Sequence, residues 1–193
     1  INLLKEKENT ILDEKLGLEV EVFGSSRGHI ASNILDSGIV FRIQDKVIVN
    51  FNDNHPTEEE CNYIKDKFKN IDLAFIPCGG GSGYPAMYEN LTLLEKQKIV
   101  SEAMGEFDLM FSKAIDILKP NMAVPVAGGF AIRGNHPHET NYLQIRHLDE
   151  NKTLDFHREN GCYQDTKIFL MQPGMELDLK KEKIVKGSYE VWD

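Results

Sequence analysis

The sequence has few cysteines and no long apolar run. Its three cysteines, Cys61, Cys78 and Cys162, lie far apart and form no C-x-x-C pair. This spacing argues against a disulfide framework and against a cysteine zinc site, and it favours a reducing compartment, with the cytoplasm as the default. No apolar stretch approaches the roughly 18 residues that a transmembrane helix needs, and no stretch has the basic-then-apolar pattern of a signal peptide.

Positive charge is also scarce. The 193 residues carry 22 Lys and Arg against 31 Asp and Glu, which gives a formal net charge of −9. Nucleic acids and anionic membrane surfaces are bound through basic surfaces, so we expect neither as the main partner. Hydrophobic residues make up 41% and charged residues 27% of the chain, a balance typical of globular proteins. Length and composition therefore indicate a single domain, residues 1–193, with a sizeable core.

The spacing of apolar residues predicts a series of strands and helices. Alternation over 18–23 predicts a strand, and the β-branched runs 38–43 and 46–51 predict a hairpin. Thr57 and Glu60 form a capping box ahead of a helix. Further elements are predicted as a short helix within 1–16, a long helix over about 91–118, and strands at 72–77, 122–126 and 167–171. The series predicts a layered α+β or mixed α/β fold.

A polar segment follows the second hairpin strand and precedes the capped helix. It contains Asn50, Asn52, Asp53, Asn54 and His55. Carboxylates and imidazoles at strand ends suit metal binding, because the sheet fixes their positions. Alternatively, Asp53 and Asn54 are turn formers that satisfy local backbone groups. The segment by itself is compatible with both interpretations.

Histidines supply a second group of candidates. His29 precedes the hairpin, and His136 and His138 form an H-x-H pair after a strand and a glycine turn. In an extended segment an H-x-H pair points both imidazoles to one side. Histidine together with aspartate is a donor set that suits zinc or iron. Solvated loop histidines are the alternative, and His147 and His157 have no supporting pattern.

A glycine-rich segment, residues 79–83, follows the strand predicted at 72–77. No Gly-Lys-Ser/Thr follows it, so it is not a phosphate-binding P-loop. Pro85 also removes a backbone donor from this segment. The glycines instead allow the backbone to pass close to another element or to a ligand. Cys78, beside them, has no assignable base and is typical of a buried structural cysteine.

Five stretches in order resemble the metallo-β-lactamase superfamily, over residues 30–180. The nearest resemblance is to the metallo-β-lactamase-like domain of CMP-N-acetylneuraminate hydroxylase and its bacterial relatives. The stretches are 36–53 (DSGIV through NFND), 80–85 (GGSGYP), 118–120 (LKP), 125–130 (PVAGGF) with His136-Pro137 after it, and 173–179 (PGMELDL).

The resemblance implies an αββα sandwich with one or two zinc or iron ions at the edge between its sheets. Asp53 falls on the metal-bridging aspartate of the family and would be the catalytic residue. His29, His136 and His138 match the positions of further metal ligands. The resemblance also implies that the glycine segment and the residue after it border the cleft on the substrate side, through Gly80, Gly81, Ser82 and Tyr84.

The chain departs from the family in one large respect. The H-x-H-x-D-H signature, which lies upstream of these stretches in the family, is nowhere in the sequence. We therefore expect the C-terminal part of a metallo-β-lactamase-like domain, and part of a metal-dependent hydrolase for a small, phosphorylated or sugar-like substrate. One alternative is a component of a sialic-acid-hydroxylase-like oxygenase, although no Rieske ligands are present. Another is a metal-free binding or assembly module that has lost the signature.

An apolar hairpin face is the last sequence feature. We expect Ile39, Phe41, Ile43, Val47 and Val49 to share one inner face that this part of the domain leaves exposed. Contiguous apolar patches beyond a few hundred Å² mark interaction surfaces. Upstream sequence, a partner chain or a homo-oligomer contact would cover this face.

Overall fold

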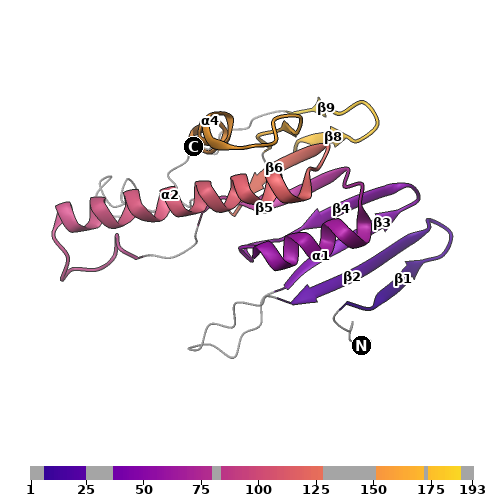
Figure 1. The fold of residues 1–193 in the computed structure, drawn as a ribbon, viewed down its shortest axis with the longest axis horizontal. Coiled ribbons are helices and arrows are strands. Elements are labelled where there is room, and N and C mark those ends of the chain that lie inside the picture. The colour runs from indigo at the N-terminus through magenta and orange to yellow at the C-terminus, as the bar shows by residue number, and fades with distance from the viewer. Residues whose placement is uncertain (1–6, 25–36, 80–83, 128–150, 172–173, 188–193) are drawn as a thin grey trace.

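The fold is a mixed seven-stranded sheet with helices packed on one face (Figure 1). This computed structural model describes residues 7–24, 37–79, 84–127, 151–171 and 174–187. The strands of the sheet, in spatial order, are β1 (Asn9–Asp13), β2 (Leu18–Gly24), β3 (Ser37–Ile43), β4 (Lys46–Asn50), β5 (Leu73–Pro77), β6 (Met122–Val126) and β7 (Lys167–Ile168). The other elements are α1 (Glu58–Phe68), α2 (Leu93–Leu118), α4 (Asn151–Asn160) and a hairpin of β8 (Glu176–Asp178) and β9 (Lys183–Lys186).

Strand direction changes halfway across the sheet. From β1 to β4 neighbouring strands are antiparallel, and from β4 to β7 they are parallel. The connections between consecutive strands of the parallel half contain helices, because a parallel pair needs a crossover of about a dozen residues or more. As a result the carboxyl ends of β4, β5 and β6 lie at the same edge of the sheet. In open sheets with parallel strands, ligands bind outside this edge.

Both long helices begin at capping boxes. Thr57 accepts from the backbone N–H of Glu60, and the Glu60 carboxylate accepts from that of Thr57, which confirms the predicted start of α1. Thr92 and Glu95 form the same reciprocal cap on α2. Each cap satisfies two of the N–H groups that a helix start leaves unpaired. The α2 helix extends past the sheet at its N-terminal end (Figure 1).

Each face of the sheet has its own apolar core. On the helix-covered face, neighbouring strands align Val40, Val49, Ala74 and Ala123, and these pack with residues of α1 and α2 such as Ile64, Phe111 and Ile115. On the second face, Leu73, Met122 and Val124 are buried against residues that include Leu177 and Leu179, in and just after β8.

The layered α+β expectation is confirmed, with several local corrections. Residues 9–13 form a strand, because their exposed side chains have no helical apolar stripe and pair along the edge of β2. The five hairpin residues do not share one face. Ile39, Phe41 and Ile43 lie half-buried on the second face, whereas Val47 and Val49 point to the helices, since the register pairs Ile39 with Asn50 and Val40 with Val49. The elements α4, β8 and β9 were not predicted.

The structure contains no candidate membrane span within its described residues. None of the helices there is both long enough and apolar enough to cross a bilayer.

A carboxylate of α2 holds the turn that follows α4. Asp116 accepts hydrogen bonds from the backbone N–H groups of Cys162 and Tyr163 at 2.8–3.0 Å. We expect Asp116→Ala to lower the free energy of unfolding by about 2 kcal/mol, since hydrogen bonds to charged groups contribute about 1.5–3 kcal/mol. Asp155→Ala is the matched control, because its exposed pair with Arg158 contributes less than about 1 kcal/mol. If urea unfolding showed equal losses of stability for Asp116→Ala and Asp155→Ala, the stabilising role of Asp116 would be contradicted.

Candidate functional site

A cavity of about 280 Å³ opens at the carboxyl edge of the parallel strands. Its described lining comes from three neighbouring strands and the residues that follow them: Asn50, Asn52, Phe75, Val126 and Ala127. The volume is close to the lower end of the range for small-molecule sites, about 300–1,000 Å³. The edge at which the sequence predicts a metal site is therefore hollow.

Two residues of this lining hold backbone conformations that side chains disfavour. Asn52 has φ 58° and Ala127 has φ 50°, both in the left-handed region. Asparagine tolerates this region, but alanine there costs about 1–2 kcal/mol. Such conformations persist only where the surroundings enforce them, and they concentrate at functional sites. They lie after β4 and after β6, on either side of the central strand β5.

The turn after β4 is fixed by its own hydrogen bonds. Asn50 Oδ1 accepts from the backbone N–H of Asn52 at 2.8 Å, and the N–H of Asn54 donates to the carbonyl of Phe51 at 2.9 Å. Phe51 is fully buried and its N–H donates to the carbonyl of Phe75 at 3.1 Å, so the turn is anchored to β5. Asp53, between these residues, is exposed. The fold thus presents the Asp53 carboxylate to solvent on a well-held turn.

A buried amide, that of Asn54, follows Asp53 directly. Asn54 is 4% exposed, and its Nδ2 makes no hydrogen bond in the described part of the chain. An unsatisfied buried donor costs about 1–3 kcal/mol. The described part of this edge thus combines one unsatisfied buried donor with two left-handed residues.

Only part of the predicted site set falls within the described residues. Asp53 lies at the carboxyl edge, as predicted. Tyr84 is 38% exposed and packs edge-on against Tyr88, with ring centroids 4.9 Å apart. His55 does not stand free in the turn, because its ring stacks on Phe107 of α2 with centroids 4.6 Å apart. The remaining predicted residues lie outside the described residues: His29, Gly80, Gly81, Ser82, His136 and His138.

Asp53 is the one predicted metal ligand that the described residues include. A carboxylate at the end of a strand is a suitable oxygen ligand for zinc or iron. Among the residues that the structure describes, no three His, Cys, Asp or Glu side chains group together. The imidazoles of the predicted set belong to segments outside those ranges. Asp53 therefore fits the role of a ligand, and its predicted partners stay a prediction.

None of the five described lining residues was predicted as a site residue from the sequence. Asn50 carried a signal, because it is polar at the end of an apolar strand. Phe75 and Ala127 carried none, since an aromatic and an alanine within apolar runs are typical of core positions.

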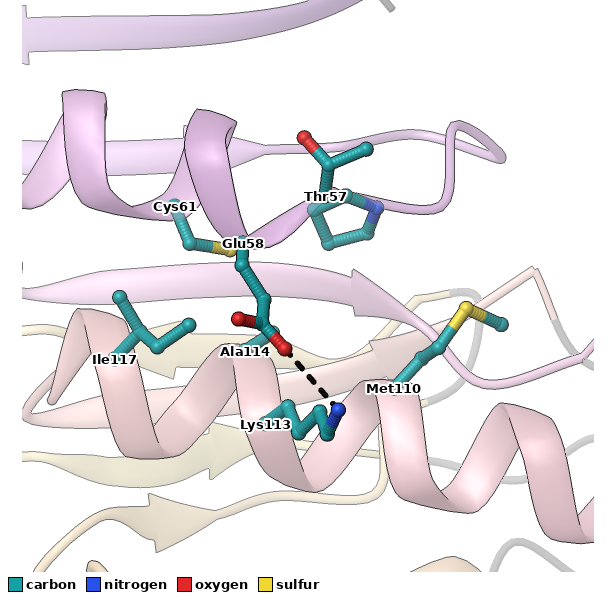
Figure 2. A pocket seen from close by; sticks show the side chains of 8 residues that line it. Thr57, Glu58, Cys61, Met110, Lys113, Ala114 and Ile117 are labelled. Carbon is teal, nitrogen blue, oxygen red and sulfur yellow. Dashed lines mark hydrogen bonds and ion pairs between the residues drawn. The ribbon is translucent and has the colours of Figure 1, made fainter. Parts of the chain in front are cut away.

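A second cavity lies between α1 and α2 and has a volume of about 150 Å³ (Figure 2). Glu58 and Lys113 form an ion pair of 3.1 Å across it, and Cys61 contributes its sulfur to the lining. Burial, followed by the charges of Glu60 and Glu58, raises the pKa of the Cys61 thiol to about 12. Since the thiolate is the nucleophile, this pKa and the burial of Cys61 argue against a nucleophilic role for its thiol at neutral pH.

The three free thiols should therefore differ sharply in reactivity. Cys162 is exposed, whereas Cys61 and Cys78 are buried. In the native protein we expect a thiol reagent such as dithionitrobenzoate to modify Cys162 within minutes and the other two only on unfolding. Mass spectrometry of the labelled peptides gives the site. Rapid native labelling of Cys61 would contradict its burial.

Solved structures with a similar fold have low sequence identity to this chain. No protein-family profile and no curated protein sequence matches it. Igni18, described as a novel metallo hydrolase from the archaeon Ignicoccus hospitalis, aligns with 96% of this chain at a TM-score of 0.52 and 15% identity. A putative Zn-dependent hydrolase of the metallo-β-lactamase superfamily from Thermotoga maritima aligns with 89% of this chain and 73% of its own, at a TM-score of 0.47 and 9% identity.

The chain spans 60% of the length of the Ignicoccus protein. At this identity the alignment shows a common fold and nothing of activity or ligand. The layered α+β fold described above is thus a fold that a solved metallo-hydrolase also has.

Proposed function

We propose that this chain is part of a metal-dependent hydrolase whose reaction centre lies at the carboxyl edge of β4, β5 and β6. The observation that carries the proposal is the exposed Asp53 carboxylate on a hydrogen-bonded turn beside the edge cavity. The fold common to this chain and the Ignicoccus metallo hydrolase supports it. The substrate is a small molecule.

Asp53 would be joined in the metal site by His29, His136 and His138. A bound zinc or iron ion lowers the pKa of its water toward neutrality and so supplies hydroxide near pH 7. Asp53 would hold and orient this centre, and its exposed side chain follows directly after the left-handed Asn52. The segment 80–83 and Tyr84 would lie on the substrate side.

The experiment is metal analysis of the full-length protein purified without added metal, followed by hydrolysis assays on ester, lactone and phosphoester panels. We expect about one or two equivalents of zinc or iron, and an activity that a chelator removes and the metal restores. Metal-free protein that gains no activity from zinc or iron would contradict the proposal and favour a binding module.

We also propose a cytoplasmic location and a protein partner surface. All three cysteines are free thiols, which suits a reducing compartment.

The second face of the sheet carries the half-buried apolar residues Ile39, Phe41 and Ile48 on β3 and β4. A second copy or another chain would cover them. Light scattering during size-exclusion chromatography would give a mass above that of one chain if a second copy binds, and a monomer mass at all concentrations would contradict a second copy as the occupant.

A further inference from the structure

Asn50 is a polar residue in an apolar row. Across five strands of the sheet, the register places Val22, Ile39, Asn50, Phe75 and Val124 side by side on the second face. The other four members are apolar. An amide in such a row gains little from apolar packing, so it is a departure from the pattern that the sheet otherwise follows. Departures of this kind are expected where a residue serves function.

One half of the Asn50 amide is already used. Its Oδ1 accepts the backbone N–H of Asn52 at 2.8 Å, which fixes the orientation of the side chain. The Nδ2 group makes no hydrogen bond with the residues that the structure describes, and Asn50 lines the edge cavity. A fixed amide therefore retains two N–H donors for another molecule.

Among the described residues, the surface next to Asn50 is apolar. Phe75 is the register partner of Asn50 on β5, so an aromatic ring stands beside the amide, and Val126 and Ala127 continue the wall. No formal charge belongs to the described lining. A phosphate or carboxylate group is normally bound through cations or several charge-assisted donors. A neutral oxygen acceptor next to a carbon surface matches this wall better.

We infer that Asn50 is a ligand-orienting residue that donates from Nδ2 to an uncharged oxygen of the substrate, while Phe75 and Val126 contact the adjoining carbon surface. A sugar ring and a neutral ester or lactone share this chemistry. The inference rests on the proposed function for the identity of the site, but the binding it describes does not require a metal. For the part of the substrate that contacts this wall, it favours a sugar-like or other neutral group over a phosphorylated one.

The test is NMR of chelator-treated full-length protein, labelled on asparagine side-chain nitrogen. Methyl glycosides form one arm, small lactones a second, and inorganic phosphate with glucose 6-phosphate a third. We expect members of the first or second arm to shift the Asn50 side-chain signal, and the responding arm identifies the source of the oxygen. No shift from either neutral arm, or shifts from the third alone, would overturn the inference.

Asn50→Asp separates orientation of the ligand from support of the turn. The aspartate retains an acceptor for the Asn52 N–H but has no N–H to donate. We expect a binding constant weakened at least about tenfold for the neutral probe, with thermal unfolding close to that of the wild type. Asn160→Asp adds the same charge on α4 and should bind normally. Normal binding by Asn50→Asp would reduce Asn50 to a structural residue and contradict the inference.

The two proposals fail in different ways. If the protein binds metal and hydrolyses substrate but no neutral probe binds at Asn50, only the inference about Asn50 is refuted. Probe binding at Asn50 in a protein that never takes up metal would refute the hydrolase and leave the ligand site standing.

Discussion

Replacing Asp53 with alanine is expected to lower the affinity of the full-length protein for zinc or iron by at least about 100-fold. Residues that merely orient metal ligands already contribute about 10- to 100-fold to affinity, so a ligand should contribute no less. Hydrolysis should fall with metal content. Isothermal titration of the apoprotein with Zn²⁺ measures the affinity, and Asp53→Asn provides a second variant that preserves the shape of the turn.

The matched control for this experiment is Asp45→Ala. Asp45 lies in the exposed turn between β3 and β4, and its side chain is 78% exposed. This variant should bind metal like the wild type. Wild-type affinity in Asp53→Ala as well would show that Asp53 is an ordinary turn residue.

The second large effect is expected from a buried carboxylate beneath α1. Glu21 on β2 is 2% exposed, and it accepts hydrogen bonds from the Tyr63 hydroxyl and from Lys67 Nζ, both at 2.6 Å. Lys67→Met should lower the free energy of unfolding by about 3 kcal/mol, because it leaves the buried carboxylate without its cation. The estimate is at the lower end of the usual range, since the Lys67 side chain is 39% exposed.

A double mutant tests whether the loss arises from the pair. Glu21→Gln combined with Lys67→Met should recover most of the stability, because no buried charge then remains unpaired. Lys113→Met is the matched control: it breaks an exposed pair with Glu58, and should cost less than about 1 kcal/mol. Additive losses in the double mutant would contradict the coupling.

The same network predicts a dependence of stability on alkaline pH. The hydrogen bond to Glu21 raises the pKa of Lys67, and burial together with the hydrogen bond to Glu21 raises the pKa of Tyr63. Both folded-state pKa values lie above their unfolded values, so the folded state retains protons that the unfolded state releases. The stabilisation is complete below the unfolded pKa, about 10, and is lost as pH rises through the folded values. In Glu21→Gln this alkaline loss should shrink, which urea unfolding between pH 8 and about 11 measures.

The sequence predicts most of the sheet from β2 to β6, together with α1 and α2. Capping residues, β-branched runs and a proline stop act locally, so the hairpin, α1, α2 and β6 follow from their own residues. The strand at 9–13 does not, because its pairing with β2 is a tertiary contact that a charged, weakly periodic segment does not reveal. The short β8 and β9 likewise depend on Leu177 and Leu179 reaching the second-face core.

The candidate site, too, can be predicted from the sequence only in part. Asp53 is recognisable because it follows a predicted strand and precedes a predicted cap. The row that contains Asn50 is not recognisable, since it needs the register of five strands. A polar residue becomes conspicuous only when its neighbours across the sheet are known.

The most direct test of the metal site is anomalous diffraction from crystals of the full-length protein, recorded at the zinc and iron absorption edges. We expect a peak about 2.0–2.2 Å from a carboxylate oxygen of Asp53, with imidazole nitrogens of His29 and His136 at about 2.0–2.1 Å. A peak elsewhere in the molecule, or Asp53 and His136 more than about 10 Å apart with neither near a metal, would contradict the assignment, because ligands of one ion lie within about 2.3 Å of it.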